Sequence, residues 1–465
     1  MRRILLAILL LALPVSAQEI AIKKGIVTDS LKVSDSLQES YSIYLPTTFQ
    51  SSRTWPVLFI FDGEGRGKSA THLFRAAAEE QGYILISSNN ISSENDLKTN
   101  LEIADRLLQA TVPRFPINMK MISSAGSNEG GKVASAIPLL YKDIHGVIAV
   151  GNHWINLDLL DEKRDFSFIG IVGDEQFTSA GMNYTAQILS HLKFPSRVYT
   201  YEGNDEWPEM RLIASAVGSL TLDAMKNKLR PIDPQLVDDL YSLDLALANK
   251  MISNQDLVGA MLFLELLEEK YDGFKDLNEI EEKQKQLKRS RNYDLQERER
   301  AEVNEKELRL IDDFIYYLGE DIRTANFENL GWWNYQKIQL DSLVRKGGEQ
   351  AKMAKRLEGL IGELSRAYRD ELKETRASLE KKLLANMIQT IFDPKNYAAY
   401  KEIITLSAQD DDFGTALFYL EEMLKHGYKN KDGLYNIEGT LGLKLTPEYN
   451  QLIEKYLGSS RFYDN

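Results

Sequence analysis

The stretch AGSNEGGKVAS (residues 125–135) joins an apolar run to a helix-length segment, and it decides the fold. Gly126 and Gly130 stand two positions before and two positions after Asn128. A sharp strand-to-helix turn needs small residues at those two positions, because its strained backbone leaves no room for side chains. Asparagine suits the centre of such a turn, since it tolerates a positive φ better than most residues. The stretch therefore predicts a strand, a sharp turn centred on Asn128, and a helix.

Outward from this turn, short apolar runs alternate with amphipathic segments from Gln18 to about Arg230. The runs are rich in Ile, Val, Tyr and Phe and are bounded by Gly, Pro, Asn or Asp, as buried strands are. Repeated strand–helix–strand order implies a mostly parallel sheet covered by helices on both faces. The predicted strands are residues 41–46, 56–62, 83–88, 117–124, 145–151, 166–174 and 197–203, and the predicted helices are 70–81, 97–111, 131–141, 180–192 and 208–225.

The second half of the chain has a different character. Pro231 and Pro234 in KLRPIDPQLVDD (228–239) end one helix and start the next, and helix formers dominate afterwards. Residues 265–309 carry many charges of both signs, which is typical of a long solvated helix or helical hairpin rather than of a nucleic-acid surface. We therefore expect an all-α C-terminal region.

A weak internal repeat lies within this region. DLVGAMLFLELLEEKY (256–271) aligns with DFGTALFYLEEMLKHG (412–427), with Ala260 over Ala416. Residues 396–424 resemble a tetratricopeptide helix pair, with Tyr400, Leu406 and Ala416 at the knob and hole positions. Such an array offers extended surface to protein partners. The alternative is a generic helical bundle that supports the first half.

The N-terminus and the composition indicate an exported protein. Two arginines, an apolar run and the small residues Val15-Ser16-Ala17 form the layout of a secretory signal peptide cleaved after Ala17. The apolar run is too short to span a membrane, and no cysteine is present for a lipid anchor or a disulfide. Cleavage removes Arg2 and Arg3 and no acidic residue, which takes the formal charge from -13 to -15. So acidic a surface repels nucleic acid and anionic lipid, and it favours protein or neutral small-molecule partners in a bacterial periplasm or at the cell surface.

Residues 41–208 resemble the α/β-hydrolase superfamily, in its branch of exported esterases, dienelactone hydrolases and polyhydroxybutyrate depolymerases. The resemblance is carried, in order, by YSIYLPTTFQSSRTWPVLFIFDGEGRG (41–67), AAAEEQGYILISSNN (76–90), EGGKVASAIP (129–138) and GNDEWP (203–208). It implies an α/β-hydrolase-like domain at 18–232 after a signal peptide at 1–17. A long-helix or helical-bundle region at 233–385 and a tetratricopeptide-like region at 386–465 follow.

The resemblance also assigns the catalytic positions. Asn128 takes the place of the nucleophile, Asp174 that of the acid, and Asp205 that of the histidine base. An amide is not a usable nucleophile, and an aspartate with an unperturbed pKa near 3.9 is a poor proton acceptor for a serine alkoxide. The backbone amides of Gly63 and Glu129 would supply the oxyanion donors. We therefore expect a non-catalytic hydrolase-like protein that needs no cofactor and binds a protein partner through its helical half.

Two alternatives stay open. The first is a carboxylic-ester hydrolase with an unorthodox set, in which Ser127 attacks and His153 or Asp205 acts as base. The second is binding of a small ligand or of Ca²⁺ in the former active site, because Asn128, Asp174 and Asp205 would offer oxygen ligands to a hard cation. Without a cation, two such carboxylates would repel each other and one would be pushed toward protonation.

Overall fold

The computed structural model describes residues 22–160, 165–204 and 206–462. The predicted signal peptide (1–17) and Asp205 lie outside these described residues. The chain forms two compact units, of which the first consists of residues up to Ile169 together with Glu209–Leu240. The second consists of Gly170–Pro208 and Tyr241–Asn465. No helix in the described part of the chain is long and apolar enough to cross a membrane.

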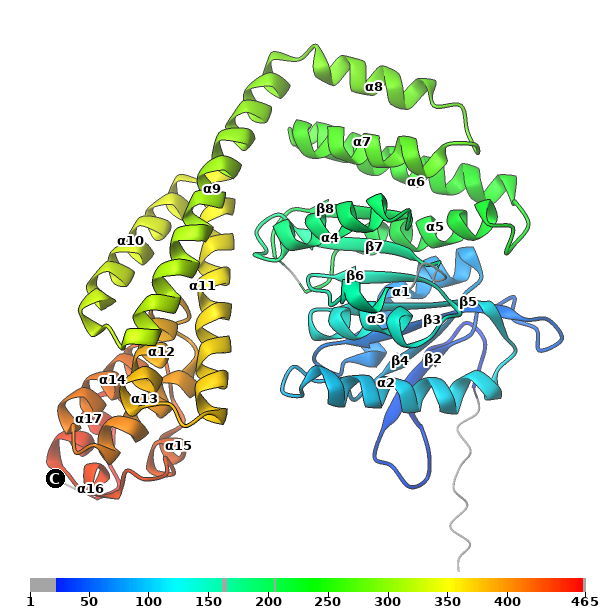
Figure 1. The fold of residues 1–465 in the computed structure, drawn as a ribbon. Coiled ribbons are helices and arrows are strands. Elements are labelled where there is room, and N and C mark those ends of the chain that lie inside the picture. The colour runs from blue at the N-terminus through cyan, green and yellow to red at the C-terminus, as the bar shows by residue number, and fades with distance from the viewer. Residues whose placement is uncertain (1–21, 161–164, 205, 463–465) are drawn as a thin grey trace, which may run out of the picture. The chain divides into compact units, whose positions relative to one another are not determined.

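An eight-stranded sheet has the strand order β1-β2-β4-β3-β5-β6-β7-β8 (Figure 1). The two pairings that involve β2, with β1 and with β4, are antiparallel, whereas β3 runs parallel to β4 and β5, and β5 runs parallel to β6. The predicted mostly parallel sheet is therefore confirmed. The strands are β1 (Thr28–Lys32), β2 (Ser40–Tyr44), β3 (Trp55–Asp62), β4 (Ile84–Ser88), β5 (Ile117–Ser127), β6 (Ile144–Val150), β7 (Ser167–Gly173) and β8 (Ser196–Tyr201).

All seven predicted strands are present, and β1 is one more than the sequence indicated. β1 has the sequence TDSLK and no fully buried residue, so it lacks the apolar pattern that identifies a strand. The central strand β3, in contrast, is almost completely buried. Residues 57–61 of β3 are at most 1% exposed, because a parallel strand covered on both faces is buried along its whole length.

Helices cover both faces of this sheet. α1 (Gly67–Gln81) packs against α5 (Met210–Lys226), and α2 (Leu97–Thr111) packs against α3 (Glu129–Leu140). The fifth helix of the hydrolase-like half is α4 (Ser179–His191), and it packs against β8. Together the sheet and these helices form an α/β-hydrolase type of architecture, as predicted from the sequence.

Only helices follow Arg230 in the described part of the chain, so the predicted all-α C-terminal region is confirmed. They are α6 (Pro234–Ser253), α7 (Leu257–Tyr271), α8 (Asn278–Lys288), α9 (Arg291–Thr324), α10 (Leu330–Lys346), α11 (Gly348–Glu374), α12 (Leu379–Phe392), α13 (Tyr397–Gln409), α14 (Phe413–Lys425), α15 (Lys431–Tyr435), α16 (Leu441–Lys444) and α17 (Pro447–Leu457). Short 3-10 turns lie at Val112–Arg114, Leu157–Leu159 and Phe327–Asn329. The highly charged residues 265–309 fall on the end of α7, on α8 and on the first half of α9.

Apolar cores hold the helices from α9 to α17 together. The first joins α9, α10, α11 and α12 around Trp333, which is fully buried and donates its ring N–H to Asp321 at 2.8 Å. The second joins α13, α14 and α17, and Tyr400 and Ala416 both lie in it. Leu406 is partly buried against a smaller neighbouring cluster. A helix pair is therefore present where the sequence resembles a tetratricopeptide repeat, and membership of that repeat family stays a prediction.

Candidate functional site

The turn that connects β5 to α3 is sharp and is centred on Asn128, as the sequence predicts. Asn128 has φ 51° and ψ −113°, a backbone conformation that side-chain-bearing residues rarely adopt. Its N–H donates to the carbonyl of Val150 at the end of β6, at 2.9 Å. Its carbonyl accepts from Lys132 N–H in the first turn of α3, at 3.1 Å. The turn is thus anchored to the sheet on one side and to the helix on the other.

Close backbone contacts explain why glycine flanks this turn. A Cβ added to Gly126 would lie 2.0 Å from the carbonyl oxygen of Gly130. A Cβ added to Gly130 would lie 2.0 Å from the carbonyl oxygen of Phe61 in β3. Both obstacles are backbone atoms, which cannot move aside as a flexible side chain can. The small-x-Asn-x-small pattern is therefore required by packing.

The side chain of Asn128 is half-buried, and its amide makes no hydrogen bond to any described residue. The amide nitrogen shares its lone pair with the carbonyl group and is a poor nucleophile. Asn128 therefore presents a hydrogen-bonding group, and no attacking atom, at the centre of the turn.

The predicted oxyanion donors lie close to each other. Gly63 follows β3, and a Cβ added to it would be 3.3 Å from the backbone nitrogen of Glu129. Asp62 shapes this loop, since its Oδ1 accepts from the Glu64 N–H at 3.0 Å and from the Arg66 Nε at 2.9 Å. The loop after β3 and the first residue of α3 therefore pack directly together. Two backbone amides are placed in the neighbourhood of Asn128.

Ser127, the nucleophile of the esterase alternative, ends β5. It lies opposite Asp62 of β3 and Val150 of β6 in the strand register, and it is 1% exposed. A hydroxyl group at that depth does not meet a substrate in this conformation. The esterase alternative therefore requires the turn to rearrange.

His153, the base of that alternative, lies in the loop after β6. Its ring packs edge-on against Phe168, with 5.9 Å between the ring centroids. Burial lowers the pKa of His153 to about 4, because the charged imidazolium loses hydration. The imidazole is therefore neutral at pH 7, but it binds a proton only weakly. General-base catalysis near neutral pH favours a group with a pKa closer to 7.

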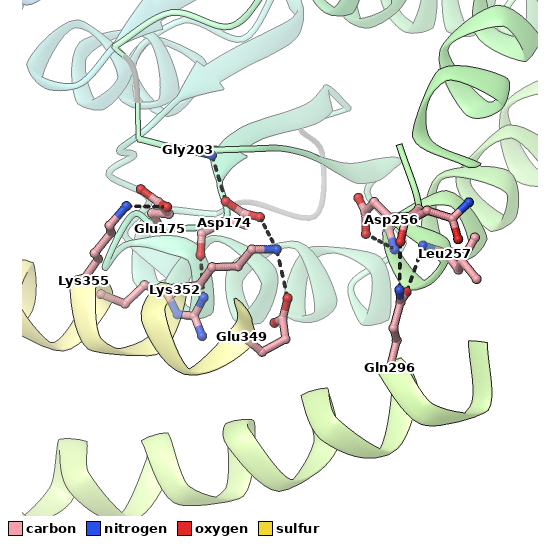
Figure 2. Close-up of polar contacts among 12 residues, drawn as sticks. Asp174, Glu175, Gly203, Asp256, Leu257, Gln296, Glu349, Lys352 and Lys355 are labelled. Atoms are coloured by element: carbon pink, nitrogen blue, oxygen red, sulfur yellow. Dashed lines mark hydrogen bonds and ion pairs between the residues drawn. The ribbon is translucent and has the colours of Figure 1, made fainter. Parts of the chain in front are cut away.

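Asp174, the predicted acid, lies directly after β7, and both of its carboxylate oxygens are engaged (Figure 2). Oδ1 accepts from the N–H of Gly203 at 2.8 Å. Oδ2 forms an ion pair with Nζ of Lys352 in α11, also at 2.8 Å. Lys352 in turn contacts Glu349 at 2.9 Å. The carboxylate thus has a lysine as its charged partner.

The pKa of Lys352 reflects this environment. Burial opposes the charged form, but hydrogen bonds to Asp174 and Glu349 outweigh burial and raise the pKa above its ordinary value. The lysine is therefore a permanent cation across the physiological range. Sequence reasoning missed it, because no local spacing connects α11 with the turn after β7.

The remaining predicted site residues stay predictions. Asn128 and Asp174 belong to different compact units, and Asp205 lies outside the described residues. No cluster of three or more His, Cys, Asp or Glu side chains able to hold a metal ion occurs in residues 22–160, 165–204 and 206–462. The convergence of these three residues on a ligand or a Ca²⁺ ion is therefore not tested.

Comparisons with known proteins return esterases. No protein-family model matches the chain, and no curated protein sequence matches it at a significant level. Among solved structures, an esterase from Pyrobaculum calidifontis has a TM-score of 0.34 and 12% identity, over 43% of this chain and 86% of that one. The S-formylglutathione hydrolase of Staphylococcus aureus has a TM-score of 0.36 and 13% identity, over 43% and 99%. The carboxylesterase EstE1 from a metagenomic library has a TM-score of 0.36 and 11% identity, over 44% and 91%.

Values this low carry no argument about chemistry. The α/β-hydrolase type of architecture is established by the order and direction of the strands and by the glycine-flanked turn at Asn128.

Proposed function

We propose that this chain is an exported, non-catalytic α/β-hydrolase-like protein that acts as a protein-binding or scaffold component of the bacterial cell envelope. One observation carries the proposal. The turn that positions the nucleophile in a hydrolase is complete in its backbone, and its central residue is Asn128, with φ 51°. The turn thus has the backbone conformation of a nucleophile turn, but its central side chain has no nucleophilic atom.

The acid position supports the same conclusion. One carboxylate oxygen of Asp174 accepts from the Gly203 N–H, and the other forms an ion pair with Lys352. Both oxygens therefore have partners other than a histidine. In the esterase alternative, the nucleophile Ser127 is buried, and His153, one of the two candidate bases, is a weakly basic imidazole. Each of these facts counts against turnover by this fold.

The binding part of the proposal rests on the C-terminal helices. Tyr316 of α9 is 64% exposed and Tyr335 of α10 is 56% exposed. The ring of Tyr317 lies 5.4 Å from that of Tyr316 and 5.1 Å from that of Trp332. Aromatic side chains gathered at a surface favour contact with another protein. The N-terminal signal-like segment supports export of such a protein to the envelope.

The first experiment is labelling of the purified mature protein with a fluorophosphonate, followed by mass spectrometry. We expect no labelled serine, beside an active esterase that labels fully under the same conditions. The Asn128→Ser variant is also expected to stay unlabelled, because the position of the base holds Asp205. A label on Ser127, or on any other serine of the unmodified chain, would overturn the non-catalytic assignment and favour the esterase alternative.

The second arm of the experiment tests binding. Full-length tagged protein is used to co-purify partners from envelope extracts of the host. A partner retained by the unmodified chain should be lost with Tyr316→Ala combined with Tyr335→Ala. The matched control is Tyr184→Ala, which alters a tyrosine 66% exposed on α4 and should leave binding intact. Loss with the control alone would refute docking through the C-terminal helices.

A further inference from the structure

The turn after β7 and one face of α11 fit each other in detail. Lys352, Lys355, Arg356 and Gly359 stand at positions i, i+3, i+4 and i+7 of α11, so they share one face of the helix. All four contact the same turn, residues 174–177. Because one helix face meets one short turn at four positions spread over about two helical turns, the contact is an extended surface rather than a single ion pair.

Three of the four contacts are polar (Figure 2). Nζ of Lys352 lies 2.8 Å from Oδ2 of Asp174, and Nζ of Lys355 lies 2.6 Å from Oε1 of Glu175. The guanidinium group of Arg356 donates to the backbone carbonyl of Asp174. Three cations of α11 thus face two carboxylates and a carbonyl group of the turn.

The fourth contact is steric. Gly359 has no side chain, and a Cβ added there would lie 3.2 Å from Cδ1 of Phe177. The ring of Phe177 therefore rests against bare helix backbone. Glycine at this position lets α11 approach the turn closely enough for the ion pairs to form.

Burial strengthens the polar contacts. The exposed fraction of the side chain is 26% for Lys352, 17% for Asp174 and 12% for Arg356. Arg356 also forms an ion pair with Glu307 of α9 at 2.6 Å, so it joins two helices to the turn. Partly buried, hydrogen-bonded pairs are screened less by water and salt than exposed pairs are.

We infer that residues 174–177 are an internal docking site for α11, held by Lys352, Lys355, Arg356 and Gly359. We call this contact the α11 clasp. In the α11 clasp, Lys352 forms an ion pair with the carboxylate of Asp174, which the resemblance implies would orient a histidine in an active hydrolase. The position that the resemblance assigns to the catalytic acid thus joins the segment Gly170–Pro208 to the C-terminal helices. The inference goes beyond the proposed function, because the clasp would hold whether or not the chain turns over esters.

A disulfide provides the test, because the chain contains no cysteine of its own. A Cβ at position 359 would lie 3.5 Å from Cβ of Phe177. This separation falls within the range of about 3.5 to 4.5 Å found in disulfides. We expect full-length Phe177→Cys with Gly359→Cys to form an intramolecular disulfide under mild oxidation, seen by mass spectrometry and by mobility on a non-reducing gel.

The matched control pairs Phe177→Cys with Gly362→Cys, which is three residues further along α11. No atom lies within 4 Å of a Cβ built at Gly362. The first pair should crosslink at least about tenfold faster than the control, given the distance requirement of the bond. Equal rates, or no disulfide in a Phe177/Gly359 double variant whose circular dichroism is that of the folded protein, would overturn the clasp.

A charge exchange tests the role of the cations in the same crosslinking reaction. Lys355→Glu should slow the crosslinking about threefold, the scale of one partly exposed ion pair, and adding Glu175→Lys should restore the rate. Arg366→Glu is the control and should leave the rate unchanged, since Arg366 pairs with Glu363 on its own helix. If neither Lys355→Glu nor Lys352→Glu changed the crosslinking rate, these two lysines would not hold α11 against the turn. Crosslinking reports geometry and fluorophosphonate labelling reports chemistry, so the two proposals fail independently.

Discussion

The turn at Asn128 and the turn at Asp174 differ in how they compare with the positions that the resemblance assigns to a hydrolase site. At Asn128 the backbone is intact, and the reactive group is absent. At Asp174 the reactive group is present, and both its oxygens are occupied, by Gly203 and Lys352. The first turn is shaped by glycines a few residues away, and the second by a helix far along the chain.

Under the proposed function, the two turns illustrate two ways in which a hydrolase-like fold lacks a working catalytic site. Backbone geometry is costly to change, because the atoms around Gly126 and Gly130 belong to neighbouring strands and to α3. The side chain at the centre of the turn is less constrained, because it is half-buried and makes no hydrogen bond to a described residue. Under the proposed function, Asp174 is retained while Lys352 of α11 pairs with its carboxylate. We make three predictions for the unit that contains the turn at Asn128, in order of decreasing effect, and they test that side of the comparison.

Gly130→Ala should break the turn at Asn128. The added methyl group would meet the Phe61 carbonyl at 2.0 Å, and backbone must move to admit it. We expect a loss of about 4 kcal/mol or more in the free energy of unfolding, or failure to fold. Gly362→Ala, in the open interior of α11, should instead be neutral or stabilise by about 0.5 to 1 kcal/mol. Urea unfolding followed by circular dichroism compares them, and a normal midpoint for Gly130→Ala would show that the turn is not constrained by packing.

His153 should make the unit that carries Asn128 sensitive to acid. Its pKa is about 4 in the folded chain and 6.5 in the unfolded chain, so between these values the unfolded state binds more protons. Its stabilising effect is complete above pH 6.5 and is lost as the pH falls to 4. The loss amounts to about 3 kcal/mol, and below pH 4 both states are protonated and the slope ends.

The measurement is urea unfolding from pH 7 to pH 4 for the unmodified chain and for His153→Leu. The variant should lose less stability over this interval. His191→Gln is the control, because that histidine is exposed at the end of α4 and lies outside the unit that carries Asn128. Identical pH profiles for the unmodified chain and His153→Leu would mean that the imidazole is solvated.

Asn128→Gly should raise stability by about 1 kcal/mol, since glycine adopts the positive φ of this residue without strain. Asn227→Gly provides the contrast, because Asn227 has φ −82° and gains nothing from glycine. We expect that variant to lose up to about 1 kcal/mol through the entropy of the unfolded chain. The midpoints of thermal unfolding compare the two. A fall in stability for Asn128→Gly equal to that for Asn227→Gly would indicate an unstrained turn.

The sequence by itself determined the features that depend on neighbours along the chain. Seven strands were recognisable from their apolar runs, and the register of the turn at Asn128 followed from the spacing of Gly126 and Gly130. The strand β1 was not predicted from the sequence. It lies at the edge of the sheet, where its residues are partly exposed and show no apolar pattern.

Only the tertiary structure decided the partner of Asp174. Lys355 and Glu175 are 180 residues apart, and the contact between their regions exists because α11 packs on the turn after β7. In the sequence, Lys352, Lys355 and Arg356 are ordinary cations of a charged helix, and Asp174 is an ordinary acid after a strand. Hydrophobic periodicity and turn preferences depend on residues close together in the sequence, so the sequence alone reveals them. The partner of a charge depends on which surfaces the folded chain brings together, and this packing decided that the acid would meet a lysine.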